Sequence, residues 1–425
     1  MKRYDEMTST PEAVWFSSIP STWRATKIRE LFSERNTKVS DKDYPALSVG
    51  KMGIVPQLDT AVKTDNGDNR KLICKGDFAI NSRSDRKGAG GISDFDGSCS
   101  LIITVLKPHK ELNSRFYHYL LRSHYFSEEY YRNGKGLVSD LWTTKWDTMQ
   151  NIYIPVPPSS EQDQIVRYLD WQTSRINKLI NGYKRQIELL EERKRTVTFY
   201  SVVYGLNHNI EMKDSIIPWI DHIPAHWSVK NLAQLFTQVK CKNTNLYEKN
   251  LLSLSYGKIK RRNIDATGGL LPESFEGYNI IEKDDIVLRL TDLQNDHKSL
   301  RTGIATEKGI VTSAYVTIRN FSENNPQYLH YYLHAFDLNK GFYNVGASGV
   351  RQSLNWDNIR TLQILLPPLN EQNQIVDYIN RTSTKIDEIK KTYEKKIELF
   401  LEYRTRLISD VVTGQIDVRD IDIPE

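Results

Sequence analysis

The sequence predicts an α+β protein: two mixed α/β modules stand in tandem, each is followed by a long helix, and the two helices pair as an antiparallel coiled coil. Three observations predict this fold: an internal repeat, strand-like runs between turn residues, and two polar segments that follow proline pairs and carry a periodic apolar seam. The chain has 425 residues, which excludes a single small domain.

The repeat is visible in three pairs of segments whose offsets are 204, 212 and 210 residues. IPSTW at 19–23 returns as IPAHW at 223–227, RFYHYLL at 115–121 matches QYLHYYL at 327–333, and PPSSEQDQIVRY at 157–168 matches PPLNEQNQIVDY at 367–378. The changing offset indicates small insertions inside a variable part. We therefore divide the chain into a first module (1–156), a first spacer helix (157–206), a second module (207–366), and a second spacer helix with a C-terminal tail (367–425).

Each module is expected to be mixed α/β. Residues 101–106, 284–290 and 314–318 are β-branched or apolar runs that lie between Gly, Asp and Asn turn residues, which is typical of strands. The aromatic-rich segments 115–126 and 327–336 are expected to be helical.

Both long helices are expected to begin directly after a proline pair. The residue before a proline avoids α geometry, Ser160 and Asn370 are suitable N-caps, and an acidic residue follows in each first turn.

A seam with alternating steps of three and four residues follows in each helix once Gln172 and Gln186 are admitted to it. Identical seams suggest that the helices pair with each other; the alternative is that each amphipathic helix packs on its own module. The predicted seam residues are Ile165, Leu169, Ile176, Leu179, Tyr183, Leu190 and Val197 in the first helix, and Ile375, Ile379, Ile386, Ile389, Tyr393, Phe400 and Leu407 in the second.

Composition narrows the class of protein. Lys and Arg number 58 against 53 Asp and Glu, and 39% of residues are hydrophobic, so a folded chain with a weak positive charge of +5 is expected. The three cysteines form no CxxC pair, and no secretory leader or apolar stretch of about 18 residues occurs. We expect a cytoplasmic protein without a membrane partner.

Motifs of catalysis with readable spacing are missing. The sequence has no GxxxxGK[ST], HExxH or GxSxG motif and lacks the tetrapeptide of amino-methyltransferases. The glycines at 88–91 are interpreted as a loop, and His118 and His330 as packing residues. We therefore predict no catalytic residue and no metal site, and binding as the function.

Basic residues in loops of both modules are the predicted DNA contacts. Arginine can bridge guanine, asparagine or glutamine can bridge adenine, and cations position phosphates. A solvated surface is the alternative for any single loop. The predicted contacts are Arg83, Arg86, Lys87 and Lys135 in the first module, and Lys258, Lys260, Arg261, Arg262, Lys298, Arg301 and Arg351 in the second.

The Glu-Gln-x-Gln turns repeat nearly intact where the modules do not. Either they pack against the modules in a fixed way, or one kind of partner subunit binds both copies. The candidate contacts with a partner subunit are Glu161, Gln162, Gln164, Glu371, Gln372 and Gln374.

With these motifs, nearly the whole chain resembles a specificity subunit of type I restriction-modification enzymes. The shared features are the proline pairs, the Glu-Gln-x-Gln turns, the Ile-Pro-x-x-Trp motifs and the closing LISDVVTG at 407–414; the first helix ends in a looser version, FYSVVYG at 199–205.

The resemblance implies that each module is a target-recognition domain that reads one half of a bipartite double-stranded DNA target, while the helix pair sets the unread spacer. It also implies two modification subunits, which carry S-adenosylmethionine and methylate adenine, and two restriction subunits, which use ATP and magnesium. No cofactor is then expected on this chain. The rival hypothesis is a scaffold whose two modules bind proteins, with the coiled pair as a spacer.

Overall fold

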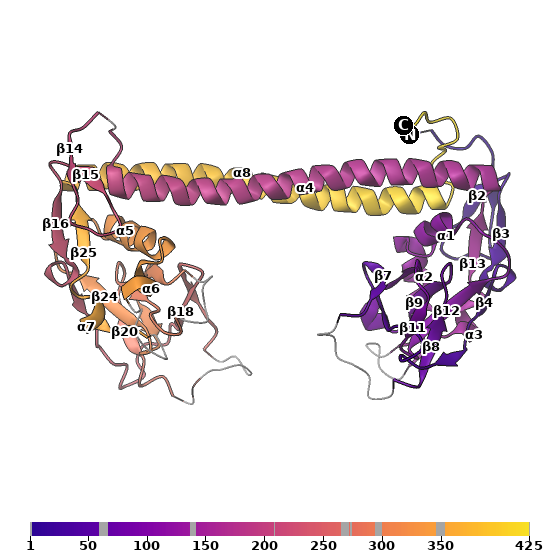
Figure 1. Cartoon of the computed structure of the whole chain (residues 1–425), viewed down its shortest axis with the longest axis horizontal. Helices are drawn as coiled ribbons and strands as arrows, with labels where there is room; N and C mark the ends of the chain where they lie inside the picture. The colour runs from indigo at the N-terminus through magenta and orange to yellow at the C-terminus, as the bar shows by residue number, and fades with distance from the viewer. Residues whose placement is uncertain are drawn as a thin grey trace. The chain divides into compact units, whose positions relative to one another are not determined.

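The computed structural model describes residues 2–58, 67–136, 142–207, 209–264, 272, 274–293, 300–345 and 353–424. The chain divides into two compact units, one made of Met1–Tyr183 with Glu394–Glu425 and the other of Lys184–Tyr393. The long helices α4 (Ser159–Tyr204) and α8 (Leu369–Val412) each contribute one part to both units (Figure 1). Among the described residues, no helix is long and apolar enough to span a membrane.

The first unit is built on an antiparallel sheet of order β10-β9-β12-β4, flanked by a second sheet of order β11-β8-β5. Helices α1 and α2 cover the first sheet, and Tyr117 of α1 meets Phe32 of β4 with ring centroids 5.5 Å apart. The elements are β1 (Met7–Ser9), β2 (Ser18–Pro20), β3 (Arg24–Lys27), β4 (Phe32–Glu34), β5 (Lys38–Val39), β6 (Leu47–Gly50), β7 (Gly53–Pro56), β8 (Arg70–Ile73), β9 (Phe78–Asn81), β10 (Gly90–Ile92), β11 (Gly97–Cys99), β12 (Ile103–Pro108), α1 (Ser114–Leu120), α2 (His124–Arg132), α3 (Trp146–Met149) and β13 (Tyr153–Val156).

The second unit repeats this plan, with an antiparallel sheet of order β17-β24-β21-β22 and with a longer helix, α5, followed by the short α6 in place of α1 and α2. Its elements are β14 (Met212–Asp214), β15 (His222–Pro224), β16 (Ser228–Asn231), β17 (Phe236–Gln238), β18 (Leu252–Ser255), β19 (Lys258–Arg261), β20 (Asn279–Ile281), β21 (Ile286–Leu288), β22 (Thr302–Ile304), β23 (Gly309–Val311), β24 (Val316–Asn320), α5 (Pro326–Leu338), α6 (Gly341–Val345), α7 (Trp356–Ile359) and β25 (Gln363–Leu366).

Local chemistry moved several boundaries from the predicted ones. The predicted helix at 115–126 breaks because Ser123 caps a new helix, its hydroxyl accepting the amide N–H of Phe126. The predicted strand at 284–290 shortens to β21 because Asp284 has a φ of 70°, a turn conformation. Strands β12 and β24 each begin two residues later than predicted. Both long helices start at the residue after the second proline, whose carbonyl accepts the N–H of Gln162 or Gln372, so Ser160 and Asn370 lie inside the helices.

The two long helices pack antiparallel within each unit. In the first unit the rings of Tyr183 and Phe400 stack with centroids 6.1 Å apart. In the second unit Lys194 binds Asp387 at 2.8 Å and Lys390 binds Glu191 at 2.6 Å. Partner numbers fall along α8 as they rise along α4, so the prediction of an antiparallel pair is confirmed.

The seam itself differs from the prediction at Leu179 and Gln186 in α4 and at Ile389 in α8. Leu179 and Ile389 are 47% and 43% exposed, whereas Ile180 is 5% exposed and Lys390 takes the corresponding place in α8. A step of four residues from Ile176 turns the helix by 400°, which keeps Ile180 close to the buried stripe. Ile187 and Ile397, which the prediction omitted, are half-buried further along, while Gln186 is exposed.

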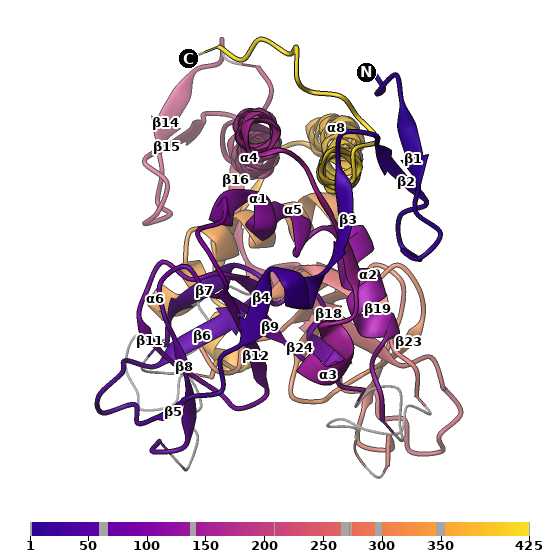
Figure 2. The ribbon, with the colours of Figure 1, turned by 90° about the vertical axis from the view of Figure 1, so that its right-hand side faces the viewer.

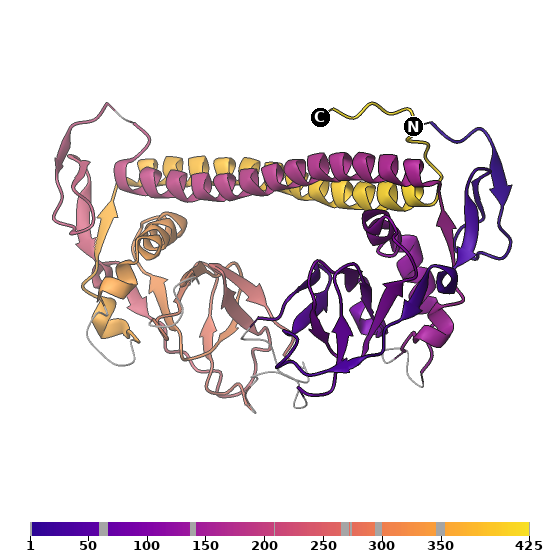
Figure 3. The ribbon, with the colours of Figure 1, turned by 45° about the vertical axis from the view of Figure 1, so that its right-hand side comes forward.

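Helices α1 and α5 attach each module to the helix pair. Figure 2 shows α1 beside α4, where the hydroxyl of Tyr119 donates to Asp170 at 2.6 Å. Figure 3 shows α5 beside α8, where the hydroxyl of Tyr331 donates to Asn380 at 2.6 Å. The paired positions, 119 with 170 and 331 with 380, establish which residues of the two units correspond.

Candidate nucleic-acid interface

In the second unit, the hairpin β18–β19 concentrates the predicted cations on one face. Side chains alternate along a strand, so Lys258 and Lys260 share a face with Arg262, while Ile259 points toward the buried cluster. The register sets Lys258 opposite Ser255 and Lys260 opposite Ser253. We call Ser253, Ser255, Lys258, Lys260 and Arg262 the basic hairpin face.

Arg261 projects from the other face of β19. Its guanidinium binds the carboxylate of Glu307, which raises the pKa of Arg261 and lowers the pKa of Glu307. Arg261 is exposed and Glu307 is half-buried, and their pairing leaves Arg261 less available for an anion than its neighbours are.

In the first unit, the predicted cations lie on a loop rather than on a hairpin. Arg83, Arg86 and Lys87 are exposed around a short 3-10 turn at Ser84–Arg86. Lys135 joins them from a distant segment, because the backbones of Arg83 and Lys135 both bridge to Thr143. Acidic neighbours partly neutralise the group: Arg86 lies 3.5 Å from Asp85, and Lys87 binds Glu128 at 3.1 Å.

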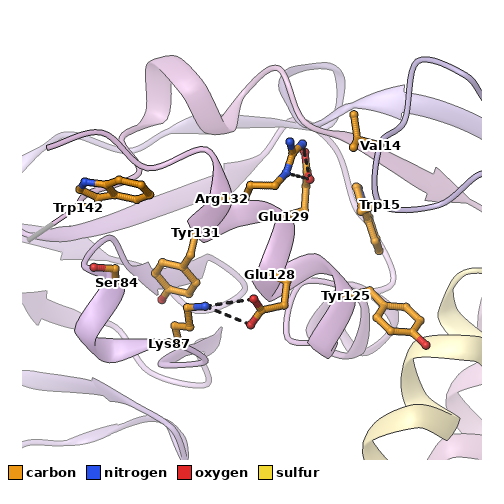
Figure 4. Close-up of a pocket in the computed structure, with 10 residues that line it drawn as sticks. All are labelled: Val14, Trp15, Ser84, Lys87, Tyr125, Glu128, Glu129, Tyr131, Arg132 and Trp142. Carbon is orange, nitrogen blue, oxygen red and sulfur yellow. Dashed lines mark hydrogen bonds and ion pairs between the residues drawn. The ribbon is translucent and has the colours of Figure 1, made fainter. Parts of the chain in front are cut away.

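An aromatic cavity of about 650 Å³ adjoins this loop (Figure 4). Its walls include Trp15, Tyr125, Tyr131 and Trp142, and Lys87 reaches its edge. These rings are not among the DNA contacts predicted from the sequence. The interleaving of aromatic with basic residues over 125–146 is the signal that would have indicated them.

The structure corrects one predicted contact and leaves two others outside the described residues. Arg301 is 1% exposed; its guanidinium donates to the carbonyl oxygens of Arg289 at 3.2 Å and Thr291 at 2.9 Å, and its backbone N–H donates to Asp337. It holds the chain around β21 and β22 together and presents no charge at the surface. Lys298 and Arg351 lie outside the described residues.

Five of the six turn residues proposed as partner contacts are engaged within their own unit. Glu161 accepts the hydroxyl of Tyr4, and Glu371 accepts the indole N–H of Trp227 at 2.9 Å. The side-chain amides of the other three residues donate to backbone carbonyl oxygens: Gln162 to Pro157, Gln164 to Val418 and Ile421, and Gln372 to Pro367.

Gln374 is the exposed exception among the six. The first of the two alternatives, fixed packing against the modules, therefore accounts for most of the repeated turn. A partner contact stays a prediction at Gln374 and at the half-buried Gln164 and Glu371, whereas Glu161, Gln162 and Gln372 are buried.

His118 is half-buried and His330 is buried, and both are neutral near pH 7. Burial lowers the pKa of His118 to about 4, with a further contribution from the charge of Arg122, and burial lowers the pKa of His330 to about 3. Within the described part of the chain, no group of three or more His, Cys, Asp or Glu is arranged to hold a metal ion.

Comparison with known proteins identifies the family. The model of the type I restriction modification DNA specificity domain matches residues 20–189 and again 224–399. The chain belongs to this family. The match covers both modules and most of both long helices, and it repeats as the internal repeat does.

Two relatives from Methanocaldococcus jannaschii are similar over much of this DNA specificity protein. The putative type I restriction enzyme MjaX specificity subunit is 21% identical, with 94% of this chain and 95% of the relative covered. The type I restriction enzyme MjaVIII specificity subunit is 25% identical over 64% of each chain. These relatives are specificity subunits. This is the class of protein predicted from the sequence, which was expected to bind and not to catalyse.

Two solved structures show the same fold. A chain from a structure on complex assembly and conformational transition of the type I R-M system has a TM-score of 0.66 at 16% identity, covering 94% of this chain and 99% of that one. The HsdS subunit from Thermoanaerobacter tengcongensis has a TM-score of 0.51 at 16% identity, covering 94% and 98%. The predicted fold class, two tandem modules with paired long helices, is confirmed.

Proposed function

We propose that this specificity subunit reads a bipartite double-stranded DNA target, one module per half-site, and that the helix pair sets the unread spacer between the halves. It directs adenine methylation by two modification subunits that bind S-adenosylmethionine, and cleavage by two restriction subunits that use ATP and magnesium. No cofactor is assigned to this chain.

The observation that carries this proposal is the contrast between two modules of one plan. Corresponding sheets and helices hold different cations: a basic hairpin face in the second unit, and the loop of Arg83, Arg86 and Lys87 in the first. Base edges are read by side chains, so modules that share a framework and differ in these side chains are suited to different sequences. This contrast favours reading over mere attachment to phosphates.

The deciding experiment maps methylated adenines in a host that carries the chain with its neighbouring methyltransferase, and in the same host without the chain. We expect a two-part motif with a fixed gap that disappears with the chain. Methylation that continues unchanged without the chain contradicts the proposal.

An exchange of residues 24–150 for the corresponding domain of another specificity subunit tests independent reading. Only one half of the mapped motif should change. A change in both halves would show that the two modules do not read separately.

The spacer function is tested by adding one heptad to each long helix, after Tyr183 and after Tyr393. Seven residues lengthen a helix by about 10.5 Å, near three base pairs at about 3.4 Å each, and keep the seam in phase. The gap in the methylated motif should grow by about three base pairs with both half-sites unchanged. An unchanged gap would show that the helix pair does not set the spacer.

The salt dependence of DNA binding distinguishes the proposed function from the alternative, a scaffold that binds proteins. DNA binding that releases several counterions weakens by orders of magnitude between about 50 and 200 mM salt. Replacing Lys258, Lys260 and Arg262 together with alanine should weaken DNA binding and preserve the fold, since all three are exposed. If DNA binding is insensitive both to salt and to this replacement, the scaffold is favoured.

A further inference from the structure

A cavity of about 420 Å³ in the first unit lies among the β6–β7 turn, the start of α2 and the two long helices. Lys51, Arg122, His124 and Arg404 line it, and none of its described lining residues is Asp or Glu. Three permanent cations thus surround a space without a carboxylate.

Arg122 is half-buried, and within the described part of the chain its hydrogen-bond partners are neutral groups. Its Nη1 lies 2.7 Å from Nε2 of His118, and its Nη2 donates to the carbonyl of Lys51 at 2.6 Å. His118 carries no charge near neutral pH, because burial holds its pKa at about 4. The nearby carboxylate of Asp170 is engaged by Arg115 and Tyr119. A partly desolvated guanidinium without a counter-charge is costly unless an anion accompanies it.

The second unit provides an internal comparison for Arg404. In the first unit Arg404 of α8 donates to the amide oxygen of Asn177. At the corresponding positions, 210 residues away, Lys194 of α4 binds the carboxylate of Asp387 at 2.8 Å. The same cross-helix position is therefore neutralised in the second unit and left positive in the first.

Arg122 shows the same contrast. The offset of 212 residues that aligns His118 with His330 places His334 at the position of Arg122. Burial and the nearby Arg195 hold the pKa of His334 at about 4, so this residue is neutral. At two positions, therefore, the first unit carries a cation without a carboxylate partner where the second unit has a neutral histidine or a paired lysine, although Arg195 stands in the second unit in place of the lining Thr405.

We propose that this cavity binds a phosphate group, and that in the working complex the phosphate belongs to the backbone of bound DNA. Arginine forks match phosphate oxygens with paired donors. The β6–β7 hairpin, whose turn carries Lys51, corresponds to the β18–β19 hairpin of the second unit, so the cavity lies beside the first unit's counterpart of the element that carries the basic hairpin face. This inference rests on the proposed function for the source of the phosphate. It assigns the first unit an attachment to DNA that carries no sequence information.

The test is Asn177→Asp in the full chain, studied as its complex with the methyltransferase subunit. The variant copies the pairing of Lys194 with Asp387, so it should fold and should neutralise Arg404. Asn181→Asp, one turn further along the exposed side of α4, makes the same chemical change outside the cavity lining and is the matched control.

Binding to DNA that contains the mapped motif is measured between about 50 and 200 mM KCl. Loss of one phosphate contact should lower the slope of log K against log salt by about 0.9 and weaken binding about five- to tenfold near 100 mM. The methylated motif should stay the same. The control should retain most of the slope and affinity, and Arg122→Gln should reproduce the effect of Asn177→Asp. Equal slopes for the wild type and both cavity variants overturn the proposal.

Inorganic phosphate separates the two sources of the ligand. If phosphate raises the melting temperature of the wild type but not of Asn177→Asp, while the DNA slopes of the two are equal, the site takes a free anion and the DNA assignment is wrong. If the wild-type complex does not bind DNA in a salt-dependent way, the proposed function fails, and the phosphate melting experiment still decides whether the cavity is an anion site.

Discussion

The indole N–H of Trp227 donates to the carboxylate of Glu371 at 2.9 Å. This bond joins the Ile-Pro-x-x-Trp motif at the start of the second module to the Glu-Gln-x-Gln turn at its end. In the second unit this bond fastens one motif to the other. In the first unit the corresponding Glu161 accepts the hydroxyl of Tyr4 instead, and the indole N–H of the buried Trp23 meets no hydrogen-bond acceptor among the described residues.

Glu371→Ala should destabilise the second unit. The substitution leaves the indole N–H of Trp227 without its acceptor and removes a contact of 2.7 Å with His226. Hydrogen bonds to a charged group contribute about 1.5–3 kcal/mol, and we expect a loss of this size in urea denaturation. Gln374→Ala, in the same turn but exposed, should change the free energy of unfolding by less than about 0.5 kcal/mol. Equal effects of the two substitutions would contradict the fastening role.

The seam of the helix pair is tested by two adjacent residues of α4. Ile180→Ala should cost about 2–4 kcal/mol of stability because it empties a buried site, whereas Leu179→Ala, at a side chain 47% exposed, should cost less than about 1 kcal/mol. Thermal and chemical denaturation of the two variants measure the difference. The reverse order would restore the seam that the sequence predicted.

Two glycines of α4 should respond to alanine with opposite sign. Gly182 lies inside the helix, and a Cβ added there would have no other atom within 4 Å. Gly182→Ala should therefore stabilise the folded protein by about 0.5–1 kcal/mol. Gly205 follows the helix end with a φ of +79°, and an added Cβ would lie 3.1 Å from the ring of Trp227. Gly205→Ala should therefore destabilise by more than about 1 kcal/mol. Melting temperatures that shift in the same direction would refute this assignment.

Acid should weaken the second unit through its buried histidines. Burial lowers the pKa of His330 to about 3, while an unfolded histidine has a pKa of about 6.5. Between these values the unfolded chain binds a proton that the folded chain does not, so stability is full above pH ~6.5 and is lost as the pH falls from about 6.5 toward about 3.

The variant His330→Gln should show this loss reduced. Between pH 7.5 and 5 its stability in urea denaturation should fall by about 1–2 kcal/mol less than that of the wild type. His222→Gln, at a residue on the surface, should follow the wild-type curve. If all three curves coincide, His330 does not contribute to the pH dependence.

The repeated plan, the helix pair and its antiparallel sense could be predicted from the sequence, because each depends on periodicity or on proline and glycine punctuation. The choice between Leu179 and Ile180 could not, since steps of three and four are both compatible with a helix and only the partner helix decides between them. The identity of the sequence-reading side chains was equally out of reach. Arg301 and Arg262 are the same residue type in similar polar segments of the sequence. Arg301 nevertheless donates to carbonyl oxygens in the interior, whereas Arg262 lies on the surface.

The role of the Glu-Gln-x-Gln turns could not be predicted from the sequence either. Their repetition indicated importance but did not separate internal packing from partner binding. Gln164 reaches the carbonyl oxygens of Val418 and Ile421, more than 250 positions along the chain, and a sequence pattern holds no information on such a distance.

The first unit draws on two segments that are far apart along the chain, whereas the second is one continuous stretch, Lys184–Tyr393. Gln164, Ser18 and the backbone of Lys2 all form hydrogen bonds with residues 415–421. During synthesis on the ribosome, the second module therefore has all of its parts as soon as it emerges. The apolar residues along the first part of α4, in contrast, are not covered by α8 until α8 has been synthesised. The first module to be translated is then the last to be completed, and during that interval these apolar residues are where we expect a chaperone or a protease to act.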